Sequence, residues 1–425
     1  MESSIHQEDL NSRGAPPLLR WDIVSRCNLS CSHCCVGEML RDDETIDLDG
    51  AQIAEGLRNA ARNGVRQVHF LGGEPTIRKD FIDIVRVARE AGLEVSYNTN
   101  GIRQDETYLQ AILDLDPISI TISLDGPDPH SHDAVRGKGT FERTLGFIKR
   151  LVAARSERGS KRPEIQIQSV LTASWANRAR NLVDLAADLG ADSLVINNLA
   201  AMGDAIENSE ALQVDAATTF KAGQEILSAL SLYPNLRVSA PIRLKVIQYY
   251  RERSGDRTTP LKENSCPALD ENSQVNHDGT ITPCQLAQSY GLGQGSDLPS
   301  VFDDDLNTIW SSSTFDEFSA KVKGPNDSVY KHQEPCNRCH FLGRGCQPCP
   351  LPSDPHYFTT NYQCLIAEGL LAHGHAKGGT DLLSDGEIER VIAEVLERAQ
   401  PRRRPEHSPH LFEQTPVRRR LPVLS

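Results

Sequence analysis

Four cysteines lie within nine residues near the start of the chain, in the stretch SRCNLSCSHCCVGE (25–38). They are Cys27, Cys31, Cys34 and Cys35, and the first three are spaced as C-x3-C-x2-C. Such thiolates serve zinc ions, iron–sulfur clusters, disulfides or redox pairs. Zinc usually takes two close pairs of ligands, whereas three thiolates in a short loop suit a [4Fe–4S] cluster with one cysteine per iron and an open fourth iron. The spacing alone favours iron–sulfur and leaves zinc possible.

The composition is that of an ordinary globular protein. The 425 residues are 38% hydrophobic and 24% charged, with a net charge of −13, and this length predicts two domains. No apolar run approaches the ~20 residues of a membrane helix, and the N-terminus lacks a secretory signal, so we expect a cytoplasmic protein with no membrane partner. In a reducing compartment, eleven cysteines favour metal ligation or redox chemistry over disulfides. The negative charge argues against nucleic acid as a partner.

Short strand-like runs alternate with amphipathic helical stretches from residue 18 to about residue 200. The predicted strands are 18–24, 66–72, 94–100, 118–125, 164–171 and 192–199. Helical patterns lie between them, for example at 47–64 and at 81–92, where a glycine ends the helix. Strand–helix units of this kind indicate a parallel sheet. Because a closed barrel of this type has eight units, the six found here predict an α/β fold with a partial (β/α)6 TIM-like barrel. An open doubly wound sheet is the alternative.

The alternation fades after about residue 236, and the chain from 262 to 366 is loop-rich and contains seven cysteines. A region with so little apolar periodicity needs metal clusters to hold its fold. We therefore predict a small loop-rich, cysteine-rich cluster-binding domain behind the barrel. The expected divisions are an N-terminal extension (1–17), the barrel (18–235), a connecting segment (236–261), the cluster-binding domain (262–370), and a C-terminal helix at 385–399 with a basic, disordered tail (371–425).

The stretch FLGGEP (70–75) ends the second predicted strand. Gly72 and Gly73 would let the backbone approach a ligand closely, and Glu74 can accept hydrogen bonds from an ammonium group. Alone, this motif would be a tight turn between a strand and a helix. Together with the cysteine triplet after the first strand, it resembles the radical S-adenosylmethionine (radical SAM) superfamily. The resemblance covers roughly residues 18–235.

That resemblance implies a SAM site at a [4Fe–4S] cluster. The implied catalytic residues, which would also hold the cluster, are Cys27, Cys31 and Cys34. The implied cofactor-binding residues are Gly72, Gly73, Glu74, Asn98, Thr99, Asn100, Ser123, Asp125 and Arg136. The GGE segment would receive the methionyl ammonium group, and Arg136 would pair with the cofactor carboxylate. The segments NTNG and LDGP are equally good turn sequences.

Two residues of the cysteine stretch have no role in this scheme. The position before Cys34, often aromatic in the family, is His33 here, which leaves the adenine contact open, and Cys35 is expected to be a free thiol. The resemblance implies that an external donor such as flavodoxin or ferredoxin reduces the cluster. SAM would then be cleaved to a 5′-deoxyadenosyl radical, which abstracts a hydrogen atom from the substrate.

The remaining cysteines form a second group. They are Cys266, Cys284, Cys336, Cys339, Cys346, Cys349 and Cys364. As an isolated fragment, its two CxxC pairs would indicate a zinc ribbon. Behind a radical SAM domain, the set resembles the seven-cysteine SPASM extension, although its last spacings depart from the usual pattern by one residue each.

The SPASM resemblance implies two auxiliary [4Fe–4S] clusters and therefore three clusters in all. The outer cluster would be held by Cys336, Cys339, Cys346 and Cys364, and the inner one by Cys266, Cys284 and Cys349. Relatives often supply a fourth inner ligand just upstream, but residues 240–265 contain no cysteine. We predict an inner cluster held by only three cysteines.

Two classes of substrate follow from the resemblance. One is a ribosomally made peptide, which would be crosslinked, joined by a thioether or epimerised in natural-product maturation; the other is a small molecule such as an aminocyclitol or sugar, oxidised or epimerised. Only about 17 residues precede the first strand, so leader recognition would need a separate leader-binding protein or the C-terminal region. Gln285, directly after Cys284, cannot act as the base of a dehydrogenase. Peptide modification is favoured narrowly, and a non-enzymatic zinc scaffold would leave GGEP unexplained.

Overall fold

The computed structural model describes residues 15–37, 39–41, 45–200, 202–230, 232–239, 268, 271–287 and 298–322, with residues 390 and 393. Apart from those last two residues, the predicted C-terminal helix and basic tail lie outside the described part. Most of the predicted cluster-binding domain also lies outside it. The same holds for six of its seven cysteines, namely Cys266, Cys336, Cys339, Cys346, Cys349 and Cys364.

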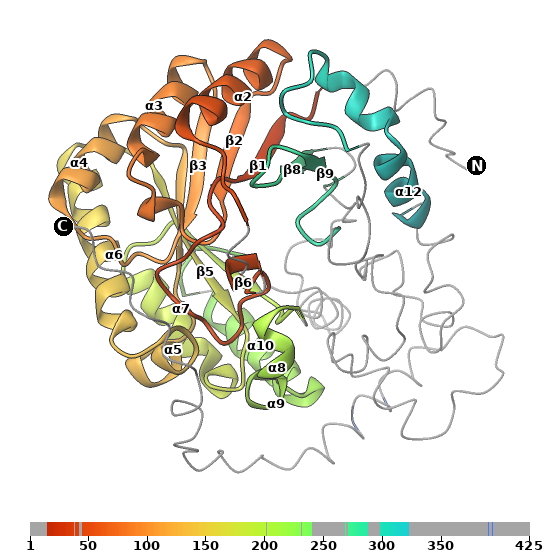
Figure 1. Ribbon diagram of the computed structural model, residues 1–425. Coiled ribbons are helices and arrows are strands. Elements are labelled where there is room, and N and C mark those ends of the chain that lie inside the picture. The colour runs from red at the N-terminus through yellow and green to blue at the C-terminus, as the bar shows by residue number, and fades with distance from the viewer. Residues whose placement is uncertain are drawn as a thin grey trace, which may run out of the picture.

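A nine-stranded sheet forms the centre of the described fold (Figure 1). Its strands are β1 (Leu18–Asp22), β2 (Gln67–Leu71), β3 (Glu94–Thr99), β4 (Ser119–Ser123), β5 (Glu164–Val170), β6 (Ser193–Asn197), β7 (Arg237–Ser239), β8 (Asn272–Val275) and β9 (Ile281–Thr282). They are arranged in the order β7-β6-β5-β4-β3-β2-β1-β8-β9, and every neighbouring pair is parallel except β8 and β9. Among the described strands, β7 and β9 form the two edges and do not pair with each other, so the sheet is not closed. This agrees with the predicted partial barrel.

The six predicted strands are all present, each with ends within two residues of the predicted ones. Three further strands were not predicted: β7, β8 and β9. Two of them have only two or three residues, too few for a periodic pattern, and β8 has the polar sequence NSQV. Pairing with β1 in parallel register, from Leu18 opposite Asn272 to Trp21 opposite Val275, brings β8 into the sheet. The start of the cysteine-rich region therefore extends the barrel sheet.

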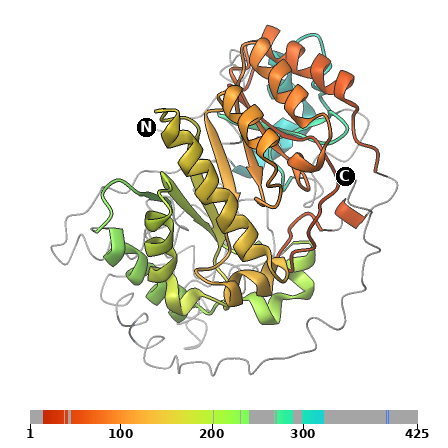
Figure 2. The ribbon, with the colours of Figure 1, turned by 90° about the vertical axis from the view of Figure 1, so that its left-hand side faces the viewer.

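Helices cover the outer side of the curved sheet (Figures 1 and 2). They are α2 (Gly50–Arg62), α3 (Phe81–Glu90), α4 (Glu106–Asp114), α5 (Pro129–Arg136), α6 (Thr140–Glu157), α7 (Ala179–Asp188), α8 (Asp204–Glu207), α9 (Ser209–Leu212), α10 (Ala216–Leu230) and α12 (Ser313–Val322), with 3₁₀ turns η1 (Met39–Arg41), η2 (Pro75–Ile77), η3 (Ala176–Arg178) and η6 (Leu306–Ser311). At the start of α2, Asp49 and Gln52 form a capping box with bonds of 2.8 and 2.9 Å. None of the described helices combines the length and apolar character needed to cross a bilayer.

The two faces of the sheet differ in chemistry because side chains alternate along each strand. The outer positions are apolar and buried under the helices: Leu19, Trp21, Val68, Phe70, Val95, Tyr97, Ile120, Ile122, Ile165, Ile167, Leu194 and Ile196. The inner positions are largely polar: Arg20, Asp22, His69, Ser96, Asn98, Thr121, Ser123, Gln166, Gln168, Ser193 and Gln274. A closed barrel fills its interior with branched apolar side chains, so this polar inner face differs from the interior of a closed barrel.

Candidate active site

The cysteine loop leaves β1 and packs directly against the turn that follows β2. The N–H of Gly73 donates to the Val24 carbonyl at 2.8 Å, and the N–H of Glu74 donates to the Arg26 carbonyl at 2.9 Å. A Cβ atom at Gly73 would overlap the Arg26 carbonyl, and Gly72 has a φ of +133° beside the Val24 carbonyl. The two glycines are thus required for this close approach, since a side chain would push the loop away.

The loop gathers three thiols. Cys27, Cys31 and Cys34 are partly exposed and form no disulfide. Burial, reinforced by neighbouring Glu74 and Cys31, raises the pKa of Cys27 to about 12, and burial raises the pKa of Cys31 and Cys34 to about 11. The thiols are therefore close enough to influence one another's charge.

These thiols do not converge on one point. Within the described ranges, no group of three or more His, Cys, Asp or Glu side chains could hold a single metal ion. A tetrahedral zinc site needs such convergence, whereas a four-iron cube takes each thiolate on a separate iron. Three thiolates on one loop are a donor set that fits the cube.

Glu74 joins the turn after β2 to the end of β3. Its carboxylate is buried, with 2% of the residue exposed. Oε1 accepts the hydroxyls of Thr76 at 2.6 Å and Thr99 at 2.8 Å, and Oε2 accepts the Asn100 N–H at 2.7 Å. The Asn100 side chain in turn donates to Asn28 Oδ1 in the cysteine loop at 2.7 Å. Burial raises the pKa of Glu74, so these donors are what make its ionised form tenable.

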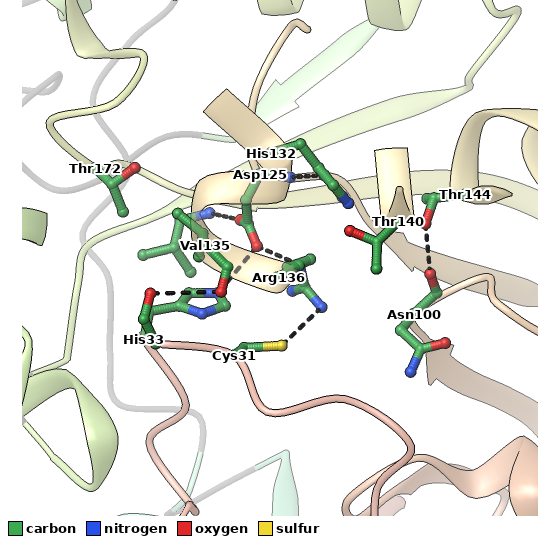
Figure 3. A network of polar contacts seen from close by, with 12 residues as sticks. Cys31, His33, Asn100, Asp125, His132, Val135, Arg136, Thr140, Thr144 and Thr172 are labelled. Atoms are coloured by element: carbon green, nitrogen blue, oxygen red, sulfur yellow. Dashed lines mark hydrogen bonds and ion pairs between the residues drawn. The ribbon is translucent and has the colours of Figure 1, made fainter. Parts of the chain in front are cut away.

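Asp125 is the centre of a second network, shown in Figure 3. Its residue is completely buried. Oδ2 accepts from Arg136 Nε at 2.5 Å and lies 3.0 Å from His33 Nε2, while Oδ1 accepts the Val170 N–H at 2.6 Å. Its backbone N–H donates to His132 Nδ1 at 3.0 Å. Burial disfavours the charge, but Arg136 and then His33 outweigh it and hold the pKa of Asp125 below its usual range.

This network fastens the cysteine loop to α5. Three consecutive loop residues take part: Arg136 Nη1 lies 3.9 Å from the Cys31 sulfur, the Ser32 N–H donates to the Val135 carbonyl at 2.9 Å, and His33 reaches Asp125. The His33 side chain is only 7% exposed. The sequence reasoning left His33 without a role, and the aspartate of the SLDG segment was the signal that could have supplied its partner.

The other two proposed cofactor contacts, Asn98 and Ser123, lie at or one residue before the ends of β3 and β4. Asn98 is on the inner face of β3, where its Oδ1 lies 2.9 Å from His69 Nε2. Ser123 ends β4 on the inner face, in register with Gln168. The structure thus gathers five of the proposed cofactor-binding residues at the carboxyl ends of the strands, beside the cysteine loop: Glu74, Thr99, Asn100, Asp125 and Arg136.

Cys35, which adjoins Cys34 and interacts with its charge, and Cys284 are the two other cysteines in the described part of the chain. Burial, with added repulsion from Asp22, raises the pKa of Cys35, which places its thiol near the end of β1. Cys284 follows β9 and is near enough to Arg20 on β1 for their charges to interact. Because β8 and β9 extend the sheet beside β1, the inner face of β1 lies between the cysteine loop and Cys284.

Comparison with protein families decides the class. The family described as the radical SAM superfamily matches residues 21–161, and the iron–sulfur cluster-binding domain SPASM matches residues 266–340. The chain thus carries a radical SAM domain followed by a SPASM domain. It is an enzyme, and these two domains imply SAM and iron–sulfur clusters as its cofactors.

Known relatives extend this match along the chain. The PqqA peptide cyclase of Rhodopseudomonas palustris is 27% identical over 358 residues, which cover 80% of this chain and 85% of that protein. The mycofactocin maturase MftC of Mycolicibacterium smegmatis is 34% identical over 137 residues, 32% of this chain and 34% of the maturase. The match to the maturase therefore covers about a third of that protein.

Solved structures share the fold. SuiB of Streptococcus suis bound to S-adenosylmethionine aligns with a TM-score of 0.59 at 19% identity and covers 81% of this chain and 77% of that one. SuiB has also been solved with its precursor peptide SuiA, with a TM-score of 0.56, 18% identity and coverage of 73% and 68%. At these identities the similarity establishes the fold alone.

Proposed function

We propose that this radical SAM enzyme modifies a ribosomally made peptide during natural-product maturation, by crosslinking, thioether formation or epimerisation. The observation that carries this proposal is the match to the PqqA peptide cyclase, which runs through 80% of the chain. The maturase relative supports it, as does a fold shared with a protein that binds a precursor peptide. The polar inner face of the sheet suits a substrate rich in amide groups.

The cysteine loop would hold the catalytic cluster through Cys27, Cys31 and Cys34. A reduced [4Fe–4S] cluster with bound SAM supplies a 5′-deoxyadenosyl radical. Burial keeps the three thiols protonated in the bare chain, so they must release protons as iron binds, and cluster assembly should improve with rising pH.

The protein's own residues would orient the amino acid part of SAM. Asp125 accepts a hydrogen bond from Nε of Arg136. The Nη1 group of Arg136 lies beside the Cys31 sulfur. From there, the two Nη groups of Arg136 can together donate a bidentate pair of hydrogen bonds to a carboxylate. On the other side, Oε2 of Glu74 accepts a single hydrogen bond among the described residues and retains capacity for an ammonium group. Glycines 72 and 73 hold this carboxylate against the loop.

The finer composition of the enzyme is part of the proposal. It would contain three [4Fe–4S] clusters, the inner auxiliary one held by Cys266, Cys284 and Cys349. It would work in the cytoplasm with an external electron donor such as flavodoxin or ferredoxin, and with a separate leader-binding protein. Supporting this, Cys284 follows β9, is near enough to Arg20 on β1 for their charges to interact, and falls within the region matched by the SPASM family.

Mass spectrometry tests the function. Anaerobically reconstituted enzyme would be incubated with SAM, dithionite and synthetic short peptides encoded beside its gene. We expect 5′-deoxyadenosine together with a mass change in one peptide, both lost in a Cys27→Ala/Cys31→Ala/Cys34→Ala variant. Arg86→Met, on the exposed surface of α3, is the control and should behave like the wild type. Formation of 5′-deoxyadenosine with every peptide unchanged would contradict the peptide assignment.

A further inference from the structure

Most polar side chains on the inner face are satisfied by each other. His69 lies 2.7 Å from Ser96 Oγ and 2.9 Å from Asn98 Oδ1, so both of its ring nitrogens are engaged. Further along the sheet, the Thr121 hydroxyl donates to Gln166 at 2.9 Å and the Gln166 amide donates to Ser193 at 3.2 Å. A ladder of this kind needs no ligand to complete it.

The ladder stops at β1 and β8. Asp22 is 4% exposed and Gln274 is fully buried, and neither Asp22 Oδ1 nor Gln274 Oε1 has a hydrogen-bond partner in the described part of the chain. No hydrogen bond or ion pair within 4 Å ties the Arg20 guanidinium to another described residue; the charges that influence it are those of Asp22 and Cys284. The Asp22 and Gln274 side chains interact with each other, but one oxygen of each is left without a partner beside the Arg20 guanidinium, whereas buried polar groups are nearly always paired.

Strand register places these three groups on one patch. Arg20 is in register with Gln274 on one side and with His69 on the other, and Asp22 follows two residues later on the same face of β1. The Cys35 thiol lies at the Asp22 end and Cys284 at the Arg20 end. The patch therefore lies between the loop proposed to hold the catalytic cluster and a cysteine proposed to hold the inner one.

We propose that Arg20, Asp22 and Gln274 form a substrate subsite for an acidic residue of the peptide. The side-chain carboxylate of that residue pairs with the Arg20 guanidinium, and its main-chain N–H groups donate to the open oxygens of Gln274 and Asp22. This inference rests on the proposed peptide function and adds the chemical class of the residue that is bound beside the cluster.

The charges of the neighbouring groups agree with an anionic ligand. Arg20 keeps its positive charge at neutral pH, as arginine does in proteins. His69 is neutral and cannot compete for the carboxylate, because burial lowers its pKa to about 3. Burial raises the pKa of Asp22 to about 7, so near neutral pH it opposes an incoming carboxylate less than an ordinary aspartate would.

A matched pair of peptides tests the subsite without requiring turnover. Ac-Ala-Glu-Ala-NH2 and Ac-Ala-Gln-Ala-NH2 would be titrated into reconstituted, SAM-loaded enzyme by anaerobic calorimetry. We expect the glutamate peptide to bind roughly 10-fold more tightly, as a charge-assisted hydrogen-bonded pair allows. Arg20→Met should abolish that preference, and Arg20→Lys should restore part of it. Arg86→Met, at an exposed pair with Asp83, should keep the full preference.

Gln274→Leu gives an independent readout. Removing the open acceptor should weaken both peptides by a similar factor and leave their ratio unchanged, because both carry the same main-chain N–H groups. Iron content and SAM affinity of each variant show whether the site still folds. Equal affinity of the two peptides for the wild type, no binding of either, or a preference that survives Arg20→Met would each overturn the subsite.

The peptide-binding experiment and the peptide-modification assay can fail independently of each other. If the glutamate preference depends on Arg20 while no encoded peptide changes mass, the subsite stands and the assigned reaction is wrong. If a peptide is modified but Arg20 makes no difference to the preference, the reaction stands and the subsite is wrong.

Discussion

Two buried aspartates at the ends of strands in the same sheet have opposite surroundings. Asp125 follows β4 and binds Arg136, His33 and the Val170 N–H through its carboxylate, so its pKa lies below the usual range. Asp22 ends β1, and its Oδ1 has no hydrogen-bond partner among the described residues, although its side chain interacts with Gln274 and Arg20; burial raises its pKa to about 7. The same buried side chain is thus fully engaged at one place and only partly engaged at the other.

This difference in hydrogen bonding indicates two different roles for the two aspartates. An aspartate whose hydrogen-bonding capacity is used inside the protein can only position its partners, here the cysteine loop and α5. An aspartate that is buried at a cost with one oxygen left without a partner can serve a ligand, because natural proteins keep such unsatisfied groups mainly at functional sites. Removing the carboxylate charge should therefore lower the unfolding free energy at Asp125 and raise it at Asp22.

The largest effect is expected for Asp125→Asn. It leaves the Arg136 guanidinium, whose side chain is 12% exposed, without its counter-charge. Breaking such a buried pair costs about 3–5 kcal/mol of unfolding free energy. Because the folded-state pKa of Asp125 is lowered, its contribution is present above the unfolded pKa of about 4 and lost only as pH falls through the folded value.

Anaerobic urea denaturation of reconstituted protein measures this loss, which should be constant between pH 5 and pH 8. Asp83→Asn, at a residue whose side chain is 72% exposed beside Arg86, is the matched control and should change the unfolding free energy by less than about 1 kcal/mol. A loss at Asp125 no larger than this control would show that the network does not hold the loop.

Asp22→Asn should shift stability in the opposite direction. The folded-state pKa of Asp22 is raised from 3.8 to about 7, so the folded chain holds its proton more tightly and is penalised as pH rises from about 4 to about 7. At about 1.4 kcal/mol per pKa unit, the penalty reaches about 4 kcal/mol at most. The asparagine variant should gain about 2–4 kcal/mol at pH 8 and about half of that or less at pH 5.

The same denaturation series at the two pH values tests this gain. A variant that is less stable than the wild type at both pH values would mean that Asp22 is already paired in the folded protein. In that case the contrast between the two aspartates would disappear, and with it the main support for the subsite.

His33→Phe probes the weaker arm of the Asp125 network. Phenylalanine restores the aromatic residue common in the family but gives up the contact with Asp125 Oδ2 at 3.0 Å. We expect the unfolding free energy to fall by about 1.5–3 kcal/mol, the usual contribution of a hydrogen bond to a charged group. We also expect a roughly five-fold weaker SAM affinity by calorimetry, because Arg136 shares that oxygen. An unchanged SAM affinity with lower stability would limit His33 to a structural role.

Much of the barrel could be predicted from the sequence, because its strands and helices have strong local periodicity. Strand β8 could not, since NSQV has no apolar alternation and joins the sheet only by pairing with β1. The cysteine loop and the GGE turn were recognisable from their spacing. The loop and the turn lie next to each other because β1 and β2 are neighbouring parallel strands, whose carboxyl ends lie on the same side of the sheet.

The contacts between side chains could not be predicted from the sequence. His33 and Asp125 are 92 residues apart in number, and Arg20 and Gln274 are in register only because β8 adds to β1. Which buried groups remain unpaired can be known only when every partner is placed. For that reason the sequence indicated the class of chemistry, while the proposed substrate contact came from the structure.

We propose that the loop after β1 holds a catalytic four-iron cluster in front of a cluster-binding domain. The first experiment is to measure the iron and sulfide content of anaerobically reconstituted protein beside that of the Cys27→Ala/Cys31→Ala/Cys34→Ala variant. We expect about twelve irons in the wild type and about eight in the variant, at four irons per cluster. Iron that is unchanged by the triple substitution, or zinc in its place, would contradict it.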